Sequence, residues 1–345
     1  MPLNSKTNNS PTVCVPTLEL PPVIQQITTA ISAGRRFLMV PHIHIDGDDL
    51  GSMIGLALAL KQLDKEVYLY SPDPVPERYQ FLQGHELITS TLPQGEFDAV
   101  FILECPDFKR LPPGLYPKQL TQTIITLDHH EDSPTEERFI GNINWVDPTM
   151  SALGEMIALI IFALDLDISA QVATAIYTSI VSDSQAFRFH GVSSRTHLIA
   201  AKLLASADID TNLVHNWTLA YRSQQEQRVT QRCAATREYI CNGQVALAEL
   251  TREMLNEAGL EDDSAIQNLL HDINNEYKAA FALFKNIDGQ KIRVSLRSQS
   301  VPVLPIAHKF GGGGHALACA MTFPTTDLAS VKSLVRAELE KLFGS

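Results

Sequence analysis

Four short apolar segments constrain the fold of the first half of this chain more than any other feature. They are residues 37–40, 66–70, 98–103 and 123–127. Each has the length and the Val, Ile, Leu, Phe or Tyr content of a buried strand, and residues 50–63 between the first two have the period and composition of a helix. Strands separated by helices form βαβ units, which produce a mainly parallel sheet. We therefore expect an α/β fold.

A second α/β pattern follows a helical region. Helices are expected at residues 152–164, 169–182 and 195–206, with a long, partly exposed connecting helix at 220–239. Further strands are expected at 245–250, 279–285 and 291–297, and an amphipathic helix at 327–343. At 345 residues, the chain is long enough for two domains.

These patterns divide the chain into four parts. Residues 1–20 are polar without apolar periodicity and are expected to be a flexible tail. The first domain then covers residues 21–210, a linker helix covers 211–240, and a smaller α/β domain with a mixed sheet covers 241–345.

The charge is acidic but unevenly placed. There are 27 Lys and Arg residues against 39 Asp and Glu residues, a net charge of −12, and this argues against a protein that binds long duplex nucleic acid. Nearly all of the surplus lies in residues 1–225. Residues 278–315 form a basic stripe that contains one acidic residue, Asp288. The basic residues of this stripe are Lys278, Lys285, Lys291, Arg293, Arg297 and Lys309.

Cysteine usage and hydropathy indicate the compartment. The five cysteines have no C-x-x-C spacing, so neither a disulfide framework nor a cysteine zinc site is expected. The apolar run at 156–164 is far shorter than the roughly 20 residues of a membrane helix. No signal peptide is recognisable at the start, so we expect a cytoplasmic protein without a membrane partner.

The segment HIHIDGDD at residues 42–49 lies between the first strand and the first helix. Ligands in open parallel sheets bind where loops leave the carboxyl ends of strands. His42, His44, Asp46, Asp48 and Asp49 supply imidazole and carboxylate groups suited to Mn, Zn or Fe. The alternative is a polar turn in which Asp48 or Asp49 caps the helix, but a cap explains neither histidine.

A second cluster, Asp128-His129-His130, ends the strand at 123–127. It can supply a ligating histidine beside a second one that holds a phosphate or donates a proton, although a solvated loop is an equal alternative for this motif alone. Glu104 ends another strand and Asp183 ends a helix. Separately each is an ordinary surface acid, but together the four motifs offer enough ligands for two metal ions.

The sequence GGGGH at residues 311–315 lies within the basic stripe. Consecutive glycines allow backbone N–H groups to converge on an anion, and His315 adds a titratable donor. The alternative is a flexible turn. Arg297 in the same stripe favours anion binding.

In combination, these motifs resemble the DHH phosphoesterases that have a DHH-associated C-terminal domain, and most closely their oligoribonuclease and PAP phosphatase branch, the nanoRNases. The resemblance extends over nearly the whole chain after the tail, with about six motifs in the family's order. It implies a doubly wound N-terminal DHH domain, a helical linker and a smaller substrate-binding domain whose Gly-rich loop faces the metals. It also implies a homodimer.

The resemblance assigns roles to individual residues. The implied ligands of two manganese ions, with Mg²⁺ or Co²⁺ as substitutes, are His42, Asp46, Asp48, Glu104, His129 and Asp183, and Glu104 would bridge the ions. The implied catalytic residues are His130, at the scissile phosphate, and Asp128. The implied substrate-binding residues are Arg297, Ser298, Gly312, Gly313, Gly314 and His315.

Five positions depart from the family pattern. Ile45 replaces a proline, Glu104 replaces an aspartate, Gln185 and Ala320 replace glycines, and His44 is additional. Glu104 is one methylene longer than the usual bridge and could alter metal spacing or preference. His44 could be a ligand, a partner of a ligand, or incidental.

The resulting hypothesis is a Mn-dependent enzyme that hydrolyses oligonucleotides of about two to five nucleotides to mononucleotides. It would also remove the 3′-phosphate of 3′-phosphoadenosine 5′-phosphate. Two ions about 3.5–4 Å apart would activate a water molecule and stabilise the pentavalent phosphate. The alternatives are a cyclic dinucleotide phosphodiesterase and a regulatory nucleotide-binding protein with weakened catalysis. A RecJ-like exonuclease acting on long strands is disfavoured.

Overall fold

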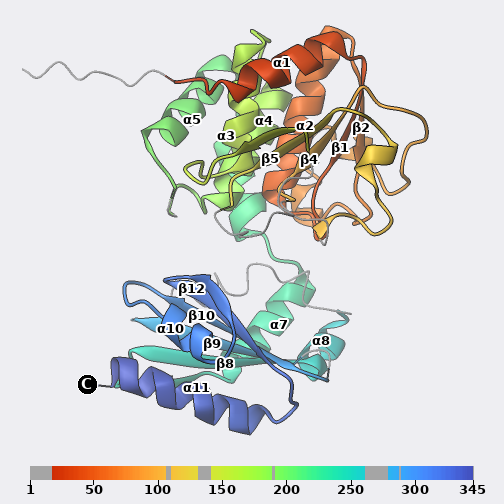
Figure 1. Ribbon diagram of the computed structural model, residues 1–345. Coiled ribbons are helices and arrows are strands. Elements are labelled where there is room, and N and C mark those ends of the chain that lie inside the picture. The colour runs from red at the N-terminus through yellow and green to blue at the C-terminus, as the bar shows by residue number, and fades with distance from the viewer. Residues whose placement is uncertain are drawn as a thin grey trace, which may run out of the picture. The chain divides into compact units, whose positions relative to one another are not determined.

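The computed structural model describes residues 18–105, 110–130, 141–188, 191–260, 279–286 and 289–344. All but the last three residues of the expected tail lie outside these ranges. The chain divides into two compact units, Met1–Thr218 and Leu219–Ser345 (Figure 1). Among the described residues, no helix combines the length and the apolar composition that a membrane crossing requires.

The first unit contains a six-stranded sheet in the order β3-β2-β1-β4-β5-β6, in which every neighbouring pair is parallel. The strands are β1 Arg36–Val40, β2 Glu66–Tyr70, β3 Ile88–Thr89, β4 Ala99–Leu103, β5 Ile124–Asp128 and β6 Ile143–Val146. The helices are α1 Val23–Ala33, α2 Gly47–Leu60, α3 Leu153–Ala163, α4 Ala170–Asp183, α5 Ser194–Ser206 and α6 Thr211–His215. The predicted doubly wound parallel sheet is confirmed, and its four predicted strands match β1, β2, β4 and β5 to within one residue.

Alternating residues of the central strands face two different layers. Leu38 and Val40 of β1 and Ile102 of β4 belong to a cluster completed by segments that connect the strands, including Leu111 and Leu115. Short 3₁₀ helices lie in the connecting segments, at Lys61–Leu63, Glu77–Tyr79, His85–Leu87 and Pro117–Gln119. Helices α2, α3 and α4 pack on one another beside the sheet (Figure 1).

Two glycines allow the close packing of these helices on α4. A Cβ atom on Gly51 of α2 would collide with the carbonyl oxygen of Ala175, and one on Gly154 of α3 would collide with the hydroxyl of Ser179. Any larger side chain would separate the helices, because interiors are close-packed. This packing places the first turns of α2 and α3 beside Ser179.

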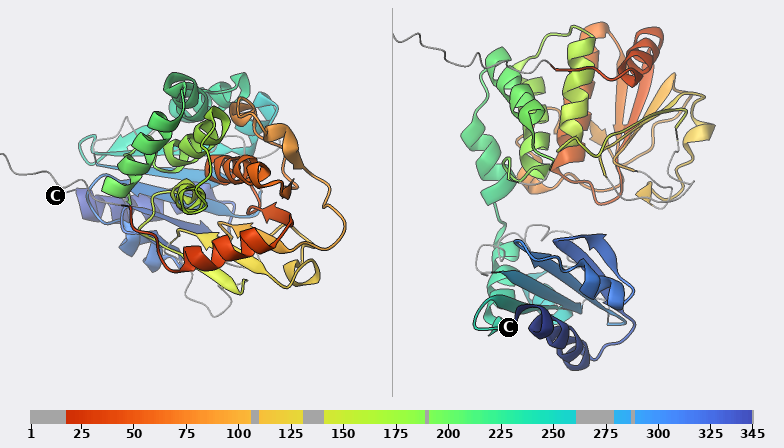
Figure 2. Two further views of the ribbon diagram at one scale, coloured as in Figure 1. Left: turned by 90° about the horizontal axis from the view of Figure 1, so that it is seen from above. Right: turned by 60° about the vertical axis from the view of Figure 1, so that its left-hand side comes forward.

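The second unit contains a mixed sheet in the order β11-β12-β10-β9-β8-β7, in which β8 and β9 are parallel and the other pairs antiparallel. The strands are β7 Glu238–Ile240, β8 Val245–Thr251, β9 Ala280–Asn286, β10 Ile292–Ser298, β11 Gly313–His315 and β12 Ala318–Phe323. The helices are α7 Gln224–Ala235, α8 Arg252–Ala258, α10 Leu304–Lys309 and α11 Leu328–Phe343. Helices α7 and α8 share one core with β8 and β9, and α10 and α11 share another with the sheet (Figure 2).

The single connecting helix predicted for residues 211–240 is interrupted. After α6, a π-helical turn covers Asn216–Ala220, and α7 begins only at Gln224. Ser223 and Glu226 form a capping box, in which each side chain accepts a hydrogen bond from the other residue's backbone N–H. This box starts a new helix at a position that the polar composition alone did not reveal.

Candidate functional site

Imidazole and carboxylate side chains converge at the carboxyl ends of the strands in the first sheet. Because β1, β4 and β5 are parallel, these ends lie at one edge of the sheet, where ligands bind in open α/β folds. His42 follows β1, Glu104 follows β4 and His129 follows β5. Side chains that could ligate metal form two groups, one of His42, Asp46, Asp49 and Glu104, the other of Asp48, His129 and Asp183.

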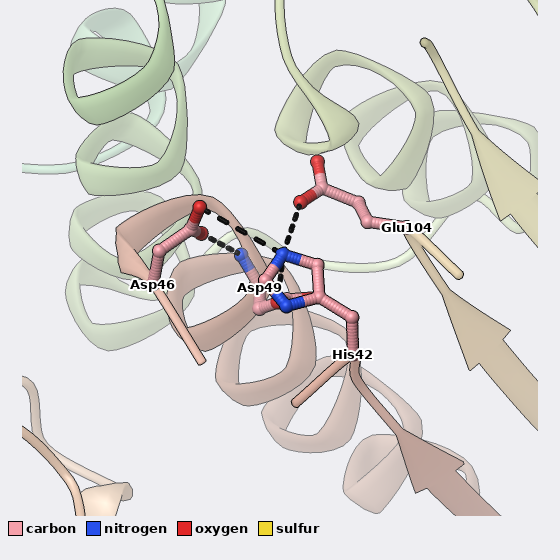
Figure 3. A group of neighbouring side chains, drawn as sticks. All are labelled: His42, Asp46, Asp49 and Glu104. Atoms are coloured by element: carbon pink, nitrogen blue, oxygen red, sulfur yellow. Dashed lines mark hydrogen bonds and ion pairs between the residues drawn. The ribbon is translucent and has the colours of Figure 1, made fainter. Parts of the chain in front are cut away.

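The first group surrounds one ring nitrogen of His42 (Figure 3). His42 Nε2 lies 3.3 Å from Asp49 Oδ2, 3.9 Å from Glu104 Oε2 and 4.0 Å from Asp46 Oδ2. The other ring nitrogen, Nδ1, lies 2.6 Å from the carbonyl oxygen of Ile43. A carbonyl only accepts hydrogen bonds, so Nδ1 is assigned the proton, and burial lowers the pKa of His42. The lone pair of Nε2 therefore faces three carboxylates.

The second group repeats this arrangement around His129. Its Nε2 lies 3.0 Å from Glu104 Oε1, 3.4 Å from Asp48 Oδ2 and 3.5 Å from Asp183 Oδ2, whereas Nδ1 lies 3.3 Å from the carbonyl oxygen of Met150. Burial opposes the charged imidazolium, but hydrogen bonds to Asp48 and Glu104 outweigh it and raise the pKa of His129. A proton on Nε2 therefore occupies the position that a cation would take.

The chemistry of the donors fits a pair of divalent cations. Burial and the nearby carboxylates raise the pKa values of Asp49 and Glu104 well above their usual range, so part of the cluster is unfavourable in its charged form. Neither oxygen of Asp49 has a hydrogen bond among the described residues. Bound cations would compensate these charges, and mixed imidazole and carboxylate ligands suit Mn, Zn or Fe.

Asp48 is the most firmly held carboxylate of the site. Its Oδ2 accepts a hydrogen bond from the backbone N–H of Leu153 at 2.7 Å, and its Oδ1 accepts one from Gly154 at 3.2 Å and another from the Ser179 hydroxyl. Burial alone would raise its pKa, but the hydrogen bonds, first that from His129, hold the pKa of Asp48 at about 2. The first turn of α3, whose N–H groups have no acceptor within the helix, thus orients this carboxylate.

Asp128 and His130, which flank His129 in the sequence, form hydrogen bonds with each other and belong to neither ligand group. Asp128 Oδ1 accepts a hydrogen bond from the backbone N–H of His130 at 3.0 Å and lies 2.9 Å from its Nδ1. The carboxylate of Asp128 is buried, whereas the His130 side chain is 42% exposed. Asp128 therefore orients the ring and places its proton on Nδ1, so that Nε2 is the ring nitrogen directed away from this carboxylate.

The structure resolves two points that the sequence left open. His44 is exposed and belongs to neither ligand group among the described residues. The helix cap is Asp46, and neither Asp48 nor Asp49, because Asp46 Oδ1 accepts hydrogen bonds from the N–H groups of both. Asp49, which the sequence offers as a candidate ligand but to which the family resemblance assigns no role, lies in the first group. A carboxylate three residues after Asp46 on the same helix is the signal that could have revealed it.

Three of the five family departures lie at strained backbone positions, and one of them is His44, with φ of 65°. Glu104 and Gln185 both have φ of 48°, in the left-handed region that non-glycine residues seldom adopt. Gln185 is partly held by a hydrogen bond of 2.9 Å from its Nε2 to the carbonyl oxygen of Ser182. Such strain concentrates at functional sites, where surrounding contacts determine the backbone.

The Gly-rich segment of the second unit differs from the expected anion-binding turn. Gly313 and Gly314 lie in strand β11, which pairs with β12. The N–H of Gly312 donates to the carbonyl oxygen of Ala307 at 2.8 Å, and the N–H of Gly311 donates to that of His308. These two N–H groups end helix α10 and are not available to an anion, whereas substrate binding by Gly313 and Gly314 remains a prediction.

Backbone register brings the other predicted substrate residues close together. Arg297 of β10 pairs with Ala318 of β12, and His315 of β11 pairs with the same Ala318. The Ser298 hydroxyl forms hydrogen bonds within the second unit: it donates to the carbonyl oxygen of Ala279 and accepts from the N–H of Val301. Arg297 and His315 thus remain predictions for phosphate binding, whereas the Ser298 hydroxyl is already occupied.

Comparison with protein families gives two matches, each confined to one unit. The model described as "DHH family, N-terminal domain" matches residues 36–180, and the DHHA1 domain model matches residues 242–341. The first range contains the ligand groups except Asp183. The second contains the Gly-rich strand and Arg297.

Several proteins with the same name are similar over most of the chain. The bifunctional oligoribonuclease and PAP phosphatase NrnA of Thermus thermophilus is 30% identical over 87% of this chain and 89% of its own. The Bacillus subtilis protein of that name is 23% identical over 92% and 97%. Among solved structures, an exopolyphosphatase-related protein of Bacteroides fragilis, 23% identical, matches with a TM-score of 0.76 over 92% of this chain and 96% of its own. The structural match demonstrates a common fold.

Proposed function

The chain belongs to the DHH family, and from that premise we propose that it is a Mn²⁺-dependent phosphoesterase that hydrolyses short oligonucleotides and removes the 3′-phosphate of 3′-phosphoadenosine 5′-phosphate. Residues 21–210 would provide the metal centre and residues 241–345 the substrate-binding domain. The names of the relatives in Thermus thermophilus and Bacillus subtilis support this choice of substrates.

One observation supports the proposal above all others. His42 and His129 each donate Nδ1–H to a backbone carbonyl and direct Nε2 at carboxylates, and Glu104 directs one oxygen at each histidine. Hydrogen-bonded imidazoles that converge with carboxylates are the arrangement by which proteins fix metal-ligating histidines. Divalent cations bound there would supply Lewis-acid stabilisation of a phosphate and a water molecule of lowered pKa.

Residues outside the two ligand groups would bind and orient the phosphates of the substrate. His130, whose Nδ1 proton is held by Asp128, would contact the scissile phosphate through Nε2 and deliver a proton there. Asp128 acts through His130 as a positioning residue. Arg297 would bind a further phosphate of the substrate, because a guanidinium offers several donors in a fixed plane.

Charge distribution supports a short substrate. The net charge of −12 disfavours long polyanions, and the stripe of residues 278–315 has six Lys and Arg residues, enough to pair with only a few phosphates. We therefore propose substrates of about two to five nucleotides, or a nucleoside bisphosphate.

The test uses the full-length protein, stripped of metal and then supplied with Mn²⁺. Four substrates are compared: a linear dinucleotide, an RNA of about five nucleotides, 3′-phosphoadenosine 5′-phosphate and a cyclic dinucleotide. We expect Mn²⁺-dependent release of mononucleotides from the first two and of phosphate from the third. Turnover of the cyclic dinucleotide alone would identify a cyclic dinucleotide phosphodiesterase, and binding without turnover a regulatory protein.

Two variants complete this experiment. Asp46→Ala removes a carboxylate of the first ligand group and should abolish turnover while leaving nucleotide affinity measurable. Asp64→Asn removes an exposed carboxylate outside both groups and should leave turnover unchanged. Full activity of Asp46→Ala would refute the assignment of the metal centre.

A further inference from the structure

We propose that Asp49 is a ligand of the cation in the first group, which then has His42 and three carboxylates as ligands. This inference deepens the proposed function and rests on it. The family resemblance assigns His42, Asp46 and Glu104 to this cation and leaves Asp49 without a role, whereas the sequence motif offers Asp49 only as one of several candidate ligands. The structure places Asp49 among them (Figure 3).

Asp49 lacks the hydrogen-bond donors that a buried carboxylate requires. Its side chain is fully buried, and within the described part of the chain neither oxygen accepts a hydrogen bond. The adjacent Asp48 is equally buried, yet it accepts hydrogen bonds from Leu153, Gly154 and Ser179. Buried carboxylates without hydrogen bonds are rare and are compensated by opposite charges or by metal.

The Asp49 side chain points toward the ring nitrogen of His42 that the other two carboxylates also face. Of the three carboxylates around His42 Nε2, Asp49 is the nearest, at 3.3 Å, compared with 3.9 Å for Glu104 and 4.0 Å for Asp46. Asp46 also uses Oδ1 to cap helix α2, whereas both oxygens of Asp49 remain for a cation. Asp46 and Asp49 are three residues apart at the start of α2 and therefore lie on one face.

A ligand set that includes Asp49 changes which metal ion the first group prefers. A third carboxylate adds negative charge and oxygen ligands to a group that otherwise resembles the second one. Oxygen-rich ligand sets favour Mn²⁺ and Mg²⁺ over the softer Zn²⁺. The first group should therefore hold Mn²⁺ more tightly, and discriminate better against Zn²⁺, than it would with Asp46 and Glu104 alone.

The experiment measures metal binding without substrate. Metal-free wild-type protein, Asp49→Asn and the control Asp64→Asn are titrated with Mn²⁺, and free Mn²⁺ is followed by its electron paramagnetic resonance signal. We expect two bound ions in wild type and in Asp64→Asn. In Asp49→Asn, one of the two should bind at least about tenfold more weakly, and competing Zn²⁺ should displace that ion at a lower concentration.

Thermal unfolding separates a ligand from a packing residue. Without metal, Asp49→Asn should melt at or above the temperature of wild type, because the variant buries a neutral isostere. With Mn²⁺, its rise in melting temperature should be smaller than that of wild type. If Asp49→Asn fails to fold, Asp49→Ala serves in its place. Unchanged affinity for both ions in the folded variant overturns this inference alone, whereas absence of Mn²⁺ binding by wild type overturns the proposed function.

Discussion

Glu104 connects the two ligand groups: its Oε1 lies 3.0 Å from His129 Nε2 and its Oε2 lies 3.9 Å from His42 Nε2. The residue is buried and sits in a left-handed backbone conformation at the end of β4. A side chain with one oxygen toward each group is suited to bridge two cations. The longer glutamate at this position of the motif is therefore compatible with a bridging role.

Glu104→Gln tests this connection. The amide keeps the size of the side chain but removes the charge and one acceptor, so we expect turnover to fall by about 100-fold or more while the fold is retained. Single-turnover rates with saturating Mn²⁺ provide the measurement. Glu104→Asp, which shortens the reach by one methylene, should fall between Gln and wild type. Equal rates for Glu104→Gln and wild type would show that this carboxylate does not bridge.

Ser179→Ala tests the anchoring of Asp48. The Ser179 hydroxyl donates to Asp48 Oδ1 inside the packing of α2, α3 and α4. Its loss should reduce the free energy of unfolding by about 1–2 kcal/mol and weaken binding of the second ion, because Asp48 would lose part of its orientation. Urea unfolding and Mn²⁺ titration measure the two effects. Ser206→Ala, at an exposed hydroxyl that bonds to Lys202 within its own helix, is the matched control. A loss of stability with unaltered Mn²⁺ affinity would contradict the link to Asp48.

Most of the first sheet could be predicted from the sequence because its central strands β1, β4 and β5 are buried and nearly continuous in apolar residues. The edge strand β3 has two residues, and β6 is largely half-buried, with Trp145 alone buried. Segments of two and four residues are too short to show a clear apolar pattern, so tertiary pairing decides them. The same applies to β11, whose glycines resemble a turn until their register with β12 is known.

The ligands could be predicted in part, because His42, Glu104 and His129 each follow a strand. The distinction between Asp48 and Asp49 could not. Asp48 is held by the N–H groups of Leu153 and Gly154, more than 100 residues away in the sequence, and only the packing of α2 against α3 reveals this. Which of two adjacent carboxylates lacks partners is a property of the folded structure.

Arg195→Met tests the ion pair between Arg195 and the buried carboxylate of Glu155. Arg195 Nε lies 2.9 Å from Glu155 Oε2, and Glu155 is fully buried. The other oxygen of Glu155 accepts hydrogen bonds from Ser151 and Thr196. Removing the guanidinium leaves a buried charge, so the free energy of unfolding should fall by about 3 kcal/mol.

The double variant Arg195→Met/Glu155→Gln provides the control for that measurement. It removes the unpaired charge and should regain part of the lost stability, because an apolar and a neutral side chain replace the pair. Chemical denaturation of the two single variants and the double variant completes the cycle. If the double variant is less stable by the sum of both single effects, the two residues act independently and the ion pair does not connect α3 to α5.

Arg297→Ala tests the predicted role of the second unit in substrate binding. Arg297 lies in β10 beside Ala318, to which His315 also pairs, so a phosphate bound by its guanidinium would lie near β11. Loss of the guanidinium removes binding that is equal in the ground state and the transition state. We therefore expect KM for a dinucleotide to rise about tenfold or more with a smaller change in kcat. Arg293→Ala removes an exposed arginine four residues earlier in the same strand and is the matched control. An equal effect of both variants would indicate a diffuse basic surface, and a fall in kcat alone would place Arg297 in the chemical step.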